Sequence, residues 1–164
     1  AISIIKENIE LRRFGVLEAG PLDLLVNYLH GEESRVGVLV KFTLSDAALK
    51  AHPRVKEVSF DLTLHAAAFA PLYLSRGEVA ADYLQEQEAI FRKQAESLGK
   101  PENGLKGIVQ GKLNKHLADV CFLEQAFVKD PSQKVSKVLE ALGKEAGGKV
   151  AISEYLYYKV GEEA

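Results

Sequence analysis

A strict alternation of side chains near residue 40 constrains the fold more than any other feature of the sequence. Four apolar side chains occupy every second position of residues 36–42 and therefore share one face of an extended chain. They are Val36, Val38, Val40 and Phe42. Residues 24–29 are also apolar, residues 9–18 have a strand's length, and turn-forming residues separate the three runs. Because short turns favour antiparallel pairing, we expect a three-stranded meander.

The middle of the chain shows the three- and four-residue spacing of amphipathic helices. One apolar stripe covers residues 54–69 and ends before a proline. A longer helix is expected over residues 78–98 and a third over residues 102–117, with a glycine and a proline between them. Two helices joined by so short a turn should form an antiparallel hairpin.

The last part of the chain mixes extended and helical patterns. We expect a short extended segment at residues 123–128, a turn at 130–132 and a short helix over 135–142 that ends at Gly143. Residues 150–160 predict a strand. This strand must return to the sheet, because nothing else could bury its tyrosines and aliphatic residues.

Strands at both ends with helices between them predict an α+β fold. We expect an antiparallel sheet of three to four strands packed by helices, with an inserted antiparallel helical hairpin. Residues 1–74 and 120–164 would form the α+β core subdomain, and residues 75–119 would form the hairpin.

Composition argues against several classes of protein. The chain has 164 residues, 47% hydrophobic and 27% charged, which suits one soluble domain. No apolar run is long enough to span a membrane, and we expect no signal peptide. The net charge of -2, with both signs interspersed, argues against a nucleic-acid partner. A single cysteine fits a reducing compartment, so we expect a cytoplasmic protein.

Candidate catalytic and metal-binding groups do not converge in the sequence. The histidines are His30, His52, His65 and His116, and their separations match no metal-ligand spacing. His65 lies on an apolar stripe and Cys121 in an apolar segment, so both are expected to be buried. The sequence has no P-loop, no nucleophile elbow and no dinucleotide-binding motif. We therefore expect no catalytic residue, no metal, no cofactor and no enzymatic activity. The residues alone indicate an interaction domain.

Several segments, in the correct order, resemble the elongation factor Ts family. Residues 8–14 resemble its N-I-x-x-R-R-F strand, and residues 28–40 resemble its Y-x-H-G and R-[VI]-G-V-L-V motifs. The clearest stretch runs from residue 99 to residue 130 and ends in LEQAFVKD. Further matches are HAAA at 65–68 and VGE at 160–162, so that the resemblance covers most of the chain from Asn8 onward.

The resemblance implies a guanine nucleotide exchange factor that binds elongation factor Tu carrying GDP and promotes GDP release during protein synthesis. Exchange of this kind is thermodynamic linkage. The factor binds nucleotide-free elongation factor Tu better than the GDP form, so the factor and GDP each weaken the other's binding. The family's T-D-F-V segment, which acts near the magnesium and phosphate site, is absent from the sequence, as is the family's N-terminal module. We therefore expect a C-terminal half that mainly docks. The alternative is a structural dimerisation or interaction module without exchange activity.

The resemblance also implies residue roles. The positions that match partner contacts of the family are His30, Gly31, Phe127, Val128 and Lys129. His30 is equally well explained as a turn residue, and Phe127 slightly better as a core residue. The hairpin resembles an insertion that mediates association between family members, so a homodimer is expected there. Its anchors would be Tyr83, Phe91 and Leu113. These three can instead form the seam between the two helices, which we favour.

The sequence departs from the family pattern at a few sites. Ala126 replaces a proline, which frees one backbone N–H, and His116 stands where an aromatic residue is common. Gly104 and Gly107 occupy positions where helix formers are usual, at about 1 kcal/mol each against alanine. These departures affect the expected stiffness of the hairpin.

Overall fold

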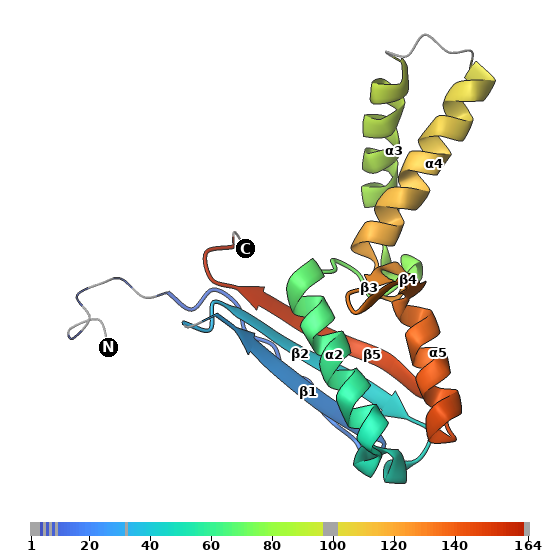
Figure 1. The fold of residues 1–164 in the computed structure, drawn as a ribbon. Helices are drawn as coiled ribbons and strands as arrows, with labels where there is room; N and C mark the ends of the chain where they lie inside the picture. Colours follow the sequence, from blue (N-terminus) through green and yellow to red (C-terminus); the bar gives the residue numbers. More distant parts are fainter. Residues whose placement is uncertain are drawn as a thin grey trace.

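A three-stranded antiparallel sheet forms the base of the part of the chain that the computed structural model describes, residues 4, 6, 8, 10–31, 33–96 and 102–162 (Figure 1). Its strands are β1 (Asp23–His30), β2 (Val36–Leu44) and β5 (Val150–Lys159), in the order β1-β2-β5. Strand β2 is central, since Val40 pairs with Val26 on one side and with Tyr155 on the other. The strand expected at the end of the chain is thereby confirmed as part of the sheet.

Helices α2 (Pro53–Phe69) and α5 (Val135–Ala146) cover one face of the sheet (Figure 1). Helix α2 matches the expected stripe: proline occupies its first turn, where no N–H is needed, and Ala70 ends it in the left-handed region at φ 44°. The alternating side chains of β2 pack beneath α2 and α5. Fully buried members of this core are Val40, Phe42, Val55, Leu62, Ala66, Phe122 and Val135.

The prediction of a strand at residues 9–18 is wrong for the described residues 10–18, which belong to no strand. A meander would place these residues beside β1, at the edge of the sheet, but they instead run along the open face of the sheet, against β5. At Gly15 an added Cβ would lie 2.7 Å from the Tyr158 hydroxyl, so the segment touches β5 closely. Phe14 is 81% exposed and Val16 is 74% exposed, so the segment leaves apolar side chains at the surface.

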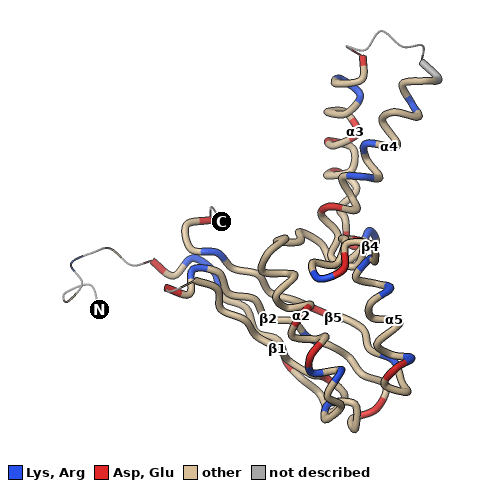
Figure 2. The backbone as a smooth tube through the Cα atoms, in the orientation of Figure 1, with Lys and Arg blue, Asp and Glu red and all other residues tan. Residues whose placement is uncertain are grey.

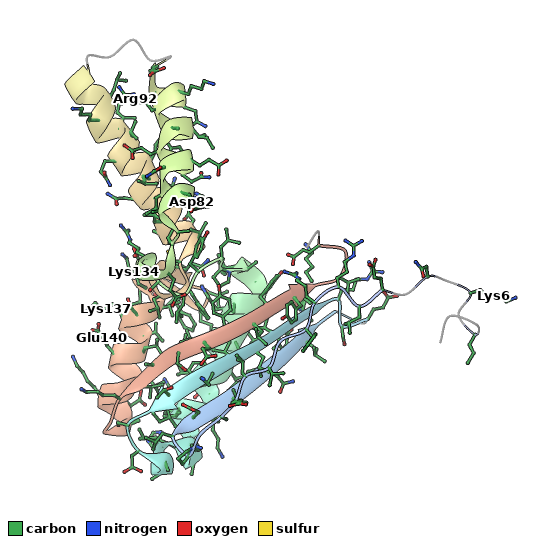
Figure 3. All side chains as sticks on the ribbon, turned by 180° about the vertical axis from the view of Figure 1, so that it is seen from behind. Lys6, Asp82, Arg92, Lys134, Lys137 and Glu140 are labelled. Carbon is green, nitrogen blue, oxygen red and sulfur yellow. The ribbon has the colours of Figure 1, made fainter. Side chains whose placement is uncertain are left out.

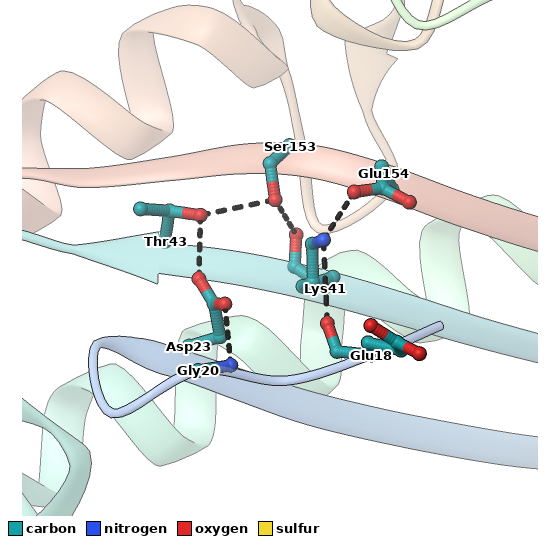
Figure 4. A network of polar contacts seen from close by, with 7 residues as sticks. All are labelled: Glu18, Gly20, Asp23, Lys41, Thr43, Ser153 and Glu154. Carbon is teal, nitrogen blue, oxygen red and sulfur yellow. Dashed lines mark hydrogen bonds and ion pairs between the residues drawn. The ribbon is translucent and has the colours of Figure 1, made fainter. Parts of the chain in front are cut away.

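Polar contacts hold this N-terminal segment to the open face of the sheet (Figure 4). The Lys41 ammonium forms an ion pair with Glu154 and lies 3.4 Å from the Glu18 carbonyl oxygen. The hydrogen bond to Glu154 raises the pKa of Lys41. Asp23 accepts from the Gly20 N–H at 2.9 Å, and the Thr43 hydroxyl lies 2.8 Å from its other oxygen. The chain is therefore fixed where it turns into β1.

Helices α3 (Ala81–Glu96) and α4 (Glu102–Val120) form the antiparallel hairpin and project away from the sheet (Figure 1). Helix α3 begins three residues later than expected, after a short 3-10 turn, η2 (Arg76–Glu78), and α4 continues three residues further. The turn expected at Gly99 and Pro101 lies outside the described residues. Among the helices described, none is both long and apolar enough to cross a bilayer.

The segment between the hairpin and α5 differs from expectation in two places. A 3-10 turn, η3 (Phe122–Glu124), leads into β3 (Ala126–Phe127), which pairs with β4 (Asp130–Lys134). The turn expected at 130–132 is therefore wrong, because the reversal lies at residues 128–129 and β4 follows it.

The helix end expected at Gly143 is also wrong. Helix α5 continues to Ala146, and Gly147 at φ 75° provides the left-handed residue that ends it. Gly143 serves close packing instead, because a Cβ there would lie 2.7 Å from the Gly148 carbonyl oxygen.

Candidate partner-binding surface

One flank of α2 carries Asp61, His65 and Phe69, which are four residues apart and lie one above another. This flank faces the segment that contains η3, β3 and the reversal into β4. His65 is fully buried, and its ring stacks on Phe69 at 4.7 Å and on Phe122 at 5.7 Å between centroids. The expectation that His65 is a core histidine is confirmed.

Residues 127–129, here called the 127–129 turn, are held against this flank by one contact each. The Phe127 ring lies 6.1 Å from the His65 ring and is 7% exposed. The Val128 N–H donates to His65 Nδ1 at 3.1 Å, and Lys129 Nζ lies 2.7 Å from Asp61 Oδ1. Phe127 therefore points into the core, while the Val128 and Lys129 side chains lie at the surface.

An exposed apolar patch lies at this turn. Val128 is 39% exposed, and Phe69, which covers the same histidine, is 50% exposed. Lys129 supplies a positive charge beside the patch, and its partner Asp61 is largely buried. An apolar centre with a charged rim is the arrangement that protein partners bind, since burying apolar area drives association and charges set orientation.

His30 and Gly31 lie at the end of β1. The Tyr28 hydroxyl is 3.0 Å from His30 Nδ1, and the Tyr28 ring meets the edge of Phe60 on α2 at 6.1 Å. Gly31 has φ 86°, which strongly favours glycine, and an added Cβ would meet nothing within 4 Å. Both residues are exposed.

The two groups of implied partner contacts lie on opposite flanks of α2. Phe60 contacts β1 on one flank, and Asp61 contacts the 127–129 turn on the other. The outer face of α2 therefore lies between His30 and Lys129. A partner that touched both groups would have to lie across this helix.

The implied dimerisation residues lie in the seam of the hairpin. Leu113 is 9% exposed, and Tyr83 and Phe91 pack against its cluster. His116 joins the seam, because its Nε2 lies 2.8 Å from the Tyr83 hydroxyl and its ring 5.7 Å from the Phe91 ring. Burial raises the pKa of Tyr83.

The outer faces of the hairpin carry charged residues, including Asp82 near its base and Arg92 nearer its tip (Figure 3). Ile90, 41% exposed, is the large apolar side chain that α3 leaves at the surface.

Sequence reasoning missed several residues of this surface. Phe60 does not fit the apolar stripe of α2, which is a signal that it has a role outside the core. Phe69 does fit the stripe but is half exposed, because the helix ends beside the 127–129 turn. Asp61 and the buried Gln125, which support this surface from beneath, had no signal in the sequence.

Metal ligands and a nucleophilic thiol are the reactive groups to consider in the part of the chain that the structure describes. Within that part of the chain, no group of three or more histidine, cysteine, aspartate or glutamate side chains could hold a metal ion. Cys121 is fully buried, and burial raises the pKa of its thiol, which opposes reaction. Basic and acidic residues are interspersed along most of the backbone rather than gathered in one region (Figure 2).

Comparisons with known proteins identify relatives over nearly the whole chain. The family described as Elongation factor TS matches residues 1–162. The chain is 45% identical to the elongation factor Ts of Borrelia hermsii over 157 residues, which are 96% of this chain and 56% of that protein. With the same coverage, it is 44% identical to the elongation factor Ts of Borrelia recurrentis and 41% identical to that of Treponema denticola. It thus spans a little more than half the length of these relatives. A match of this extent shows that the chain belongs to the elongation factor Ts family.

Proposed function

We propose that this chain binds elongation factor Tu in the cytoplasm and acts as the docking part of a guanine nucleotide exchange factor. The observation that carries the proposal is the exposed apolar patch at the 127–129 turn, in a chain of the elongation factor Ts family. The turn is fixed by Lys129–Asp61 and by Val128–His65 contacts, so little conformational freedom is lost when a partner binds.

Promotion of GDP release belongs to the same proposal. Exchange requires only that the factor and the nucleotide weaken each other's binding, and no covalent chemistry is needed. The sequence contains no T-D-F-V segment. We therefore expect this chain to bind elongation factor Tu while accelerating GDP release only weakly.

The test is a calorimetric titration of nucleotide-free elongation factor Tu with the chain, paired with release of a fluorescent GDP analogue. Val128→Asp should weaken binding by about tenfold, because it places a charge at the centre of the apolar patch. The matched control is Lys137→Glu, an exposed charge change on α5. No binding by the wild-type chain, or equal binding by both variants, would contradict the proposal.

A second candidate, favoured by the exposed Ile90, is association of two chains through their hairpins. Sedimentation at high concentration should then show a dimer that Ile90→Glu abolishes and the exposed charge reversal Lys93→Glu on the same helix leaves intact. A strict monomer would exclude this candidate.

A further inference from the structure

His65 uses both ring nitrogens, although it is completely buried. Nδ1 accepts a hydrogen bond from the Val128 N–H at 3.1 Å, and Nε2 lies 2.9 Å from Gln125 Oε1. A backbone N–H can only donate, so Nδ1 must be the unprotonated nitrogen. Nε2 therefore carries the proton and donates it to the amide oxygen of Gln125.

The bonding continues beyond Gln125. Its Nε2 donates to the Asp119 carbonyl oxygen at 2.6 Å, in the last turn of α4. Gln125 is itself 3% exposed, and its backbone oxygen accepts from Val135 N–H at 3.0 Å. A single directed chain of hydrogen bonds thus runs from the 127–129 turn, through α2, to the base of the hairpin.

We propose that His65 is a positioning residue for partner binding: only as the neutral, Nε2-protonated ring does it fix the 127–129 turn and join it to the base of the hairpin. This inference rests on the proposed function in so far as it concerns the partner. The geometry of the turn itself can be tested without one.

Protonation of His65 would reverse one of its bonds. Nδ1–H would then face the Val128 N–H, and two donors 3.1 Å apart repel each other. The buried cation would also have no carboxylate bonded to it, since Asp61 is paired with Lys129. Titratable groups on the neighbouring elements include Asp130 and Lys134 in β4, Cys121 and Glu124 in the η3 segment, and Tyr155 in β5, whose ring packs on Phe122.

The direction of the pH effect follows from burial. Burial lowers the pKa of His65 below its ordinary value of 6.5, and the hydrogen bond to Gln125 opposes this shift only in part. Because the pKa of His65 is lower in the folded state than in the unfolded state, His65 stabilises the turn fully above about pH 6.5. The stabilisation is lost as the pH falls from there toward the folded-state pKa.

Two substitutions separate the two bonds. His65→Asn places an amide oxygen close to the position of Nδ1, so it can still accept from Val128, but it does not reach Gln125. His65→Gln places an amide nitrogen close to the position of Nε2, so it can still donate to Gln125, but it offers Val128 no acceptor. Both amides are neutral at every pH used.

The first readout is the amide exchange protection of Val128 by NMR, corrected for intrinsic rates. We expect His65→Gln to lower protection at least about fivefold, and His65→Asn to retain it within about twofold. In the wild type, protection should fall below about pH 6.5, and this step should be absent from both variants. Equal protection in both variants, or a pH step that survives in them, would overturn the inference.

The second readout is calorimetric binding to elongation factor Tu. His65→Gln should weaken binding more than His65→Asn does, and the wild-type affinity alone should fall through the same pH step. If the wild-type chain does not bind, the proposed function fails while the Val128 measurement still decides the role of His65. If neither variant folds, the ¹⁵N shifts of the wild-type ring decide: an Nδ1-protonated ring or an imidazolium at pH 7.5 would overturn the assignment.

Discussion

The sheet layer and the hairpin bury their apolar residues in different ways. The core beneath α2 and α5 joins side chains from β2, β5 and both helices, which are distant in sequence, and Leu62 at its centre is fully buried. The cluster of the hairpin is smaller, and its buried members are Val79, Leu113, Leu117 and Cys121. Regions with few buried contacts open at lower free-energy cost than the core. We therefore propose that the hairpin is the less stable unit.

The two regions meet at a polar joint. Arg76, in η2, forms a two-pronged ion pair with Glu124, in which Nη2 lies 2.7 Å from Oε2, and it donates to Asn114 of α4 at 3.0 Å. An isolated parallel β-bridge between the backbones of Tyr73 and Cys121 lies beside this ion pair. The orientation of the hairpin is therefore set by a few specific contacts at its base.

The largest expected effect compares the same substitution in the two regions. Leu62→Ala should lower the free energy of unfolding by about 3 kcal/mol, because it leaves a cavity at a fully buried position of the core. Leu113→Ala should cost less and act locally, raising amide exchange in α3 and α4 with little change in the global urea midpoint. If Leu113→Ala lowers the global midpoint as much as Leu62→Ala, the two regions unfold as one unit and the comparison fails.

Substitution of a buried glycine by alanine should cost more stability than alanine substitution at its exposed neighbour. Gly143→Ala would place a methyl group 2.7 Å from the Gly148 carbonyl oxygen, and backbone must move to accept it. We expect a loss of about 1–3 kcal/mol in urea unfolding. The control is Lys144→Ala on the exposed side of the same helix, with a change of about 0.5 kcal/mol at most. A neutral Gly143→Ala would mean that the end of α5 is looser than its packing suggests.

The fold was largely predictable where a periodic pattern and tertiary burial agree. The stripe of α2 and the alternation of β2 specified those elements, and residues 150–160 joined the sheet as expected. Residues 9–18 have a strand's length but form no strand over the described residues 10–18, which lie against the open face of the sheet instead of pairing at the edge of β1. Local sequence does not determine whether such a segment pairs at the edge of a sheet or packs on its face.

The candidate surface was predictable only in part. The family resemblance pointed to residues 127–129, but which of them face outward depends on how they pack against α2. Phe127 is buried, whereas the next residue, Val128, is exposed. The bond from Val128 to His65 joins residues 63 positions apart, so no local pattern could have indicated it. The β4 strand was missed because Asp130 and Pro131 are turn formers, whereas pairing with β3 holds them extended.

A smaller effect is expected at the joint between the two regions. The hydrogen bond from Arg76 lowers the pKa of Glu124 below its ordinary value of 4.5. The pair therefore contributes stability that is present above pH 4.5 and is lost as the pH falls through the folded-state pKa of Glu124. Both side chains are partly exposed, so Arg76→Gln should cost only about 1 kcal/mol at pH 7, as measured by urea unfolding.

The same measurement at low pH checks the cause. The difference between the wild type and Arg76→Gln should shrink as Glu124 becomes protonated. A difference that stays constant with pH would mean that Arg76 acts through packing or through Asn114 instead.

The smallest effects, and the only stabilising ones, are expected in α4. Gly107 and Gly111 lie inside this helix, and an added Cβ would meet nothing within 4 Å at either position. Alanine should therefore raise the stability of α4 by about 0.5–1 kcal/mol at each site, because it removes backbone freedom from the unfolded chain at no steric cost. The measurement is the amide exchange protection of α4 beside the global urea midpoint.

The contrast with Gly143→Ala then locates the difference between the two regions in packing, since one substitution has opposite signs in the two places. Protection that rises in α4 without a shift of the global midpoint would show that the hairpin unfolds by itself. A rise in both the protection of α4 and the global midpoint would show that the hairpin unfolds together with the core. The alanine variants can also be tested for the hairpin-mediated dimer that Ile90→Glu is expected to abolish. If they are more stable but no longer dimerise, the two glycines keep a face of α4 open for close approach of a second helix.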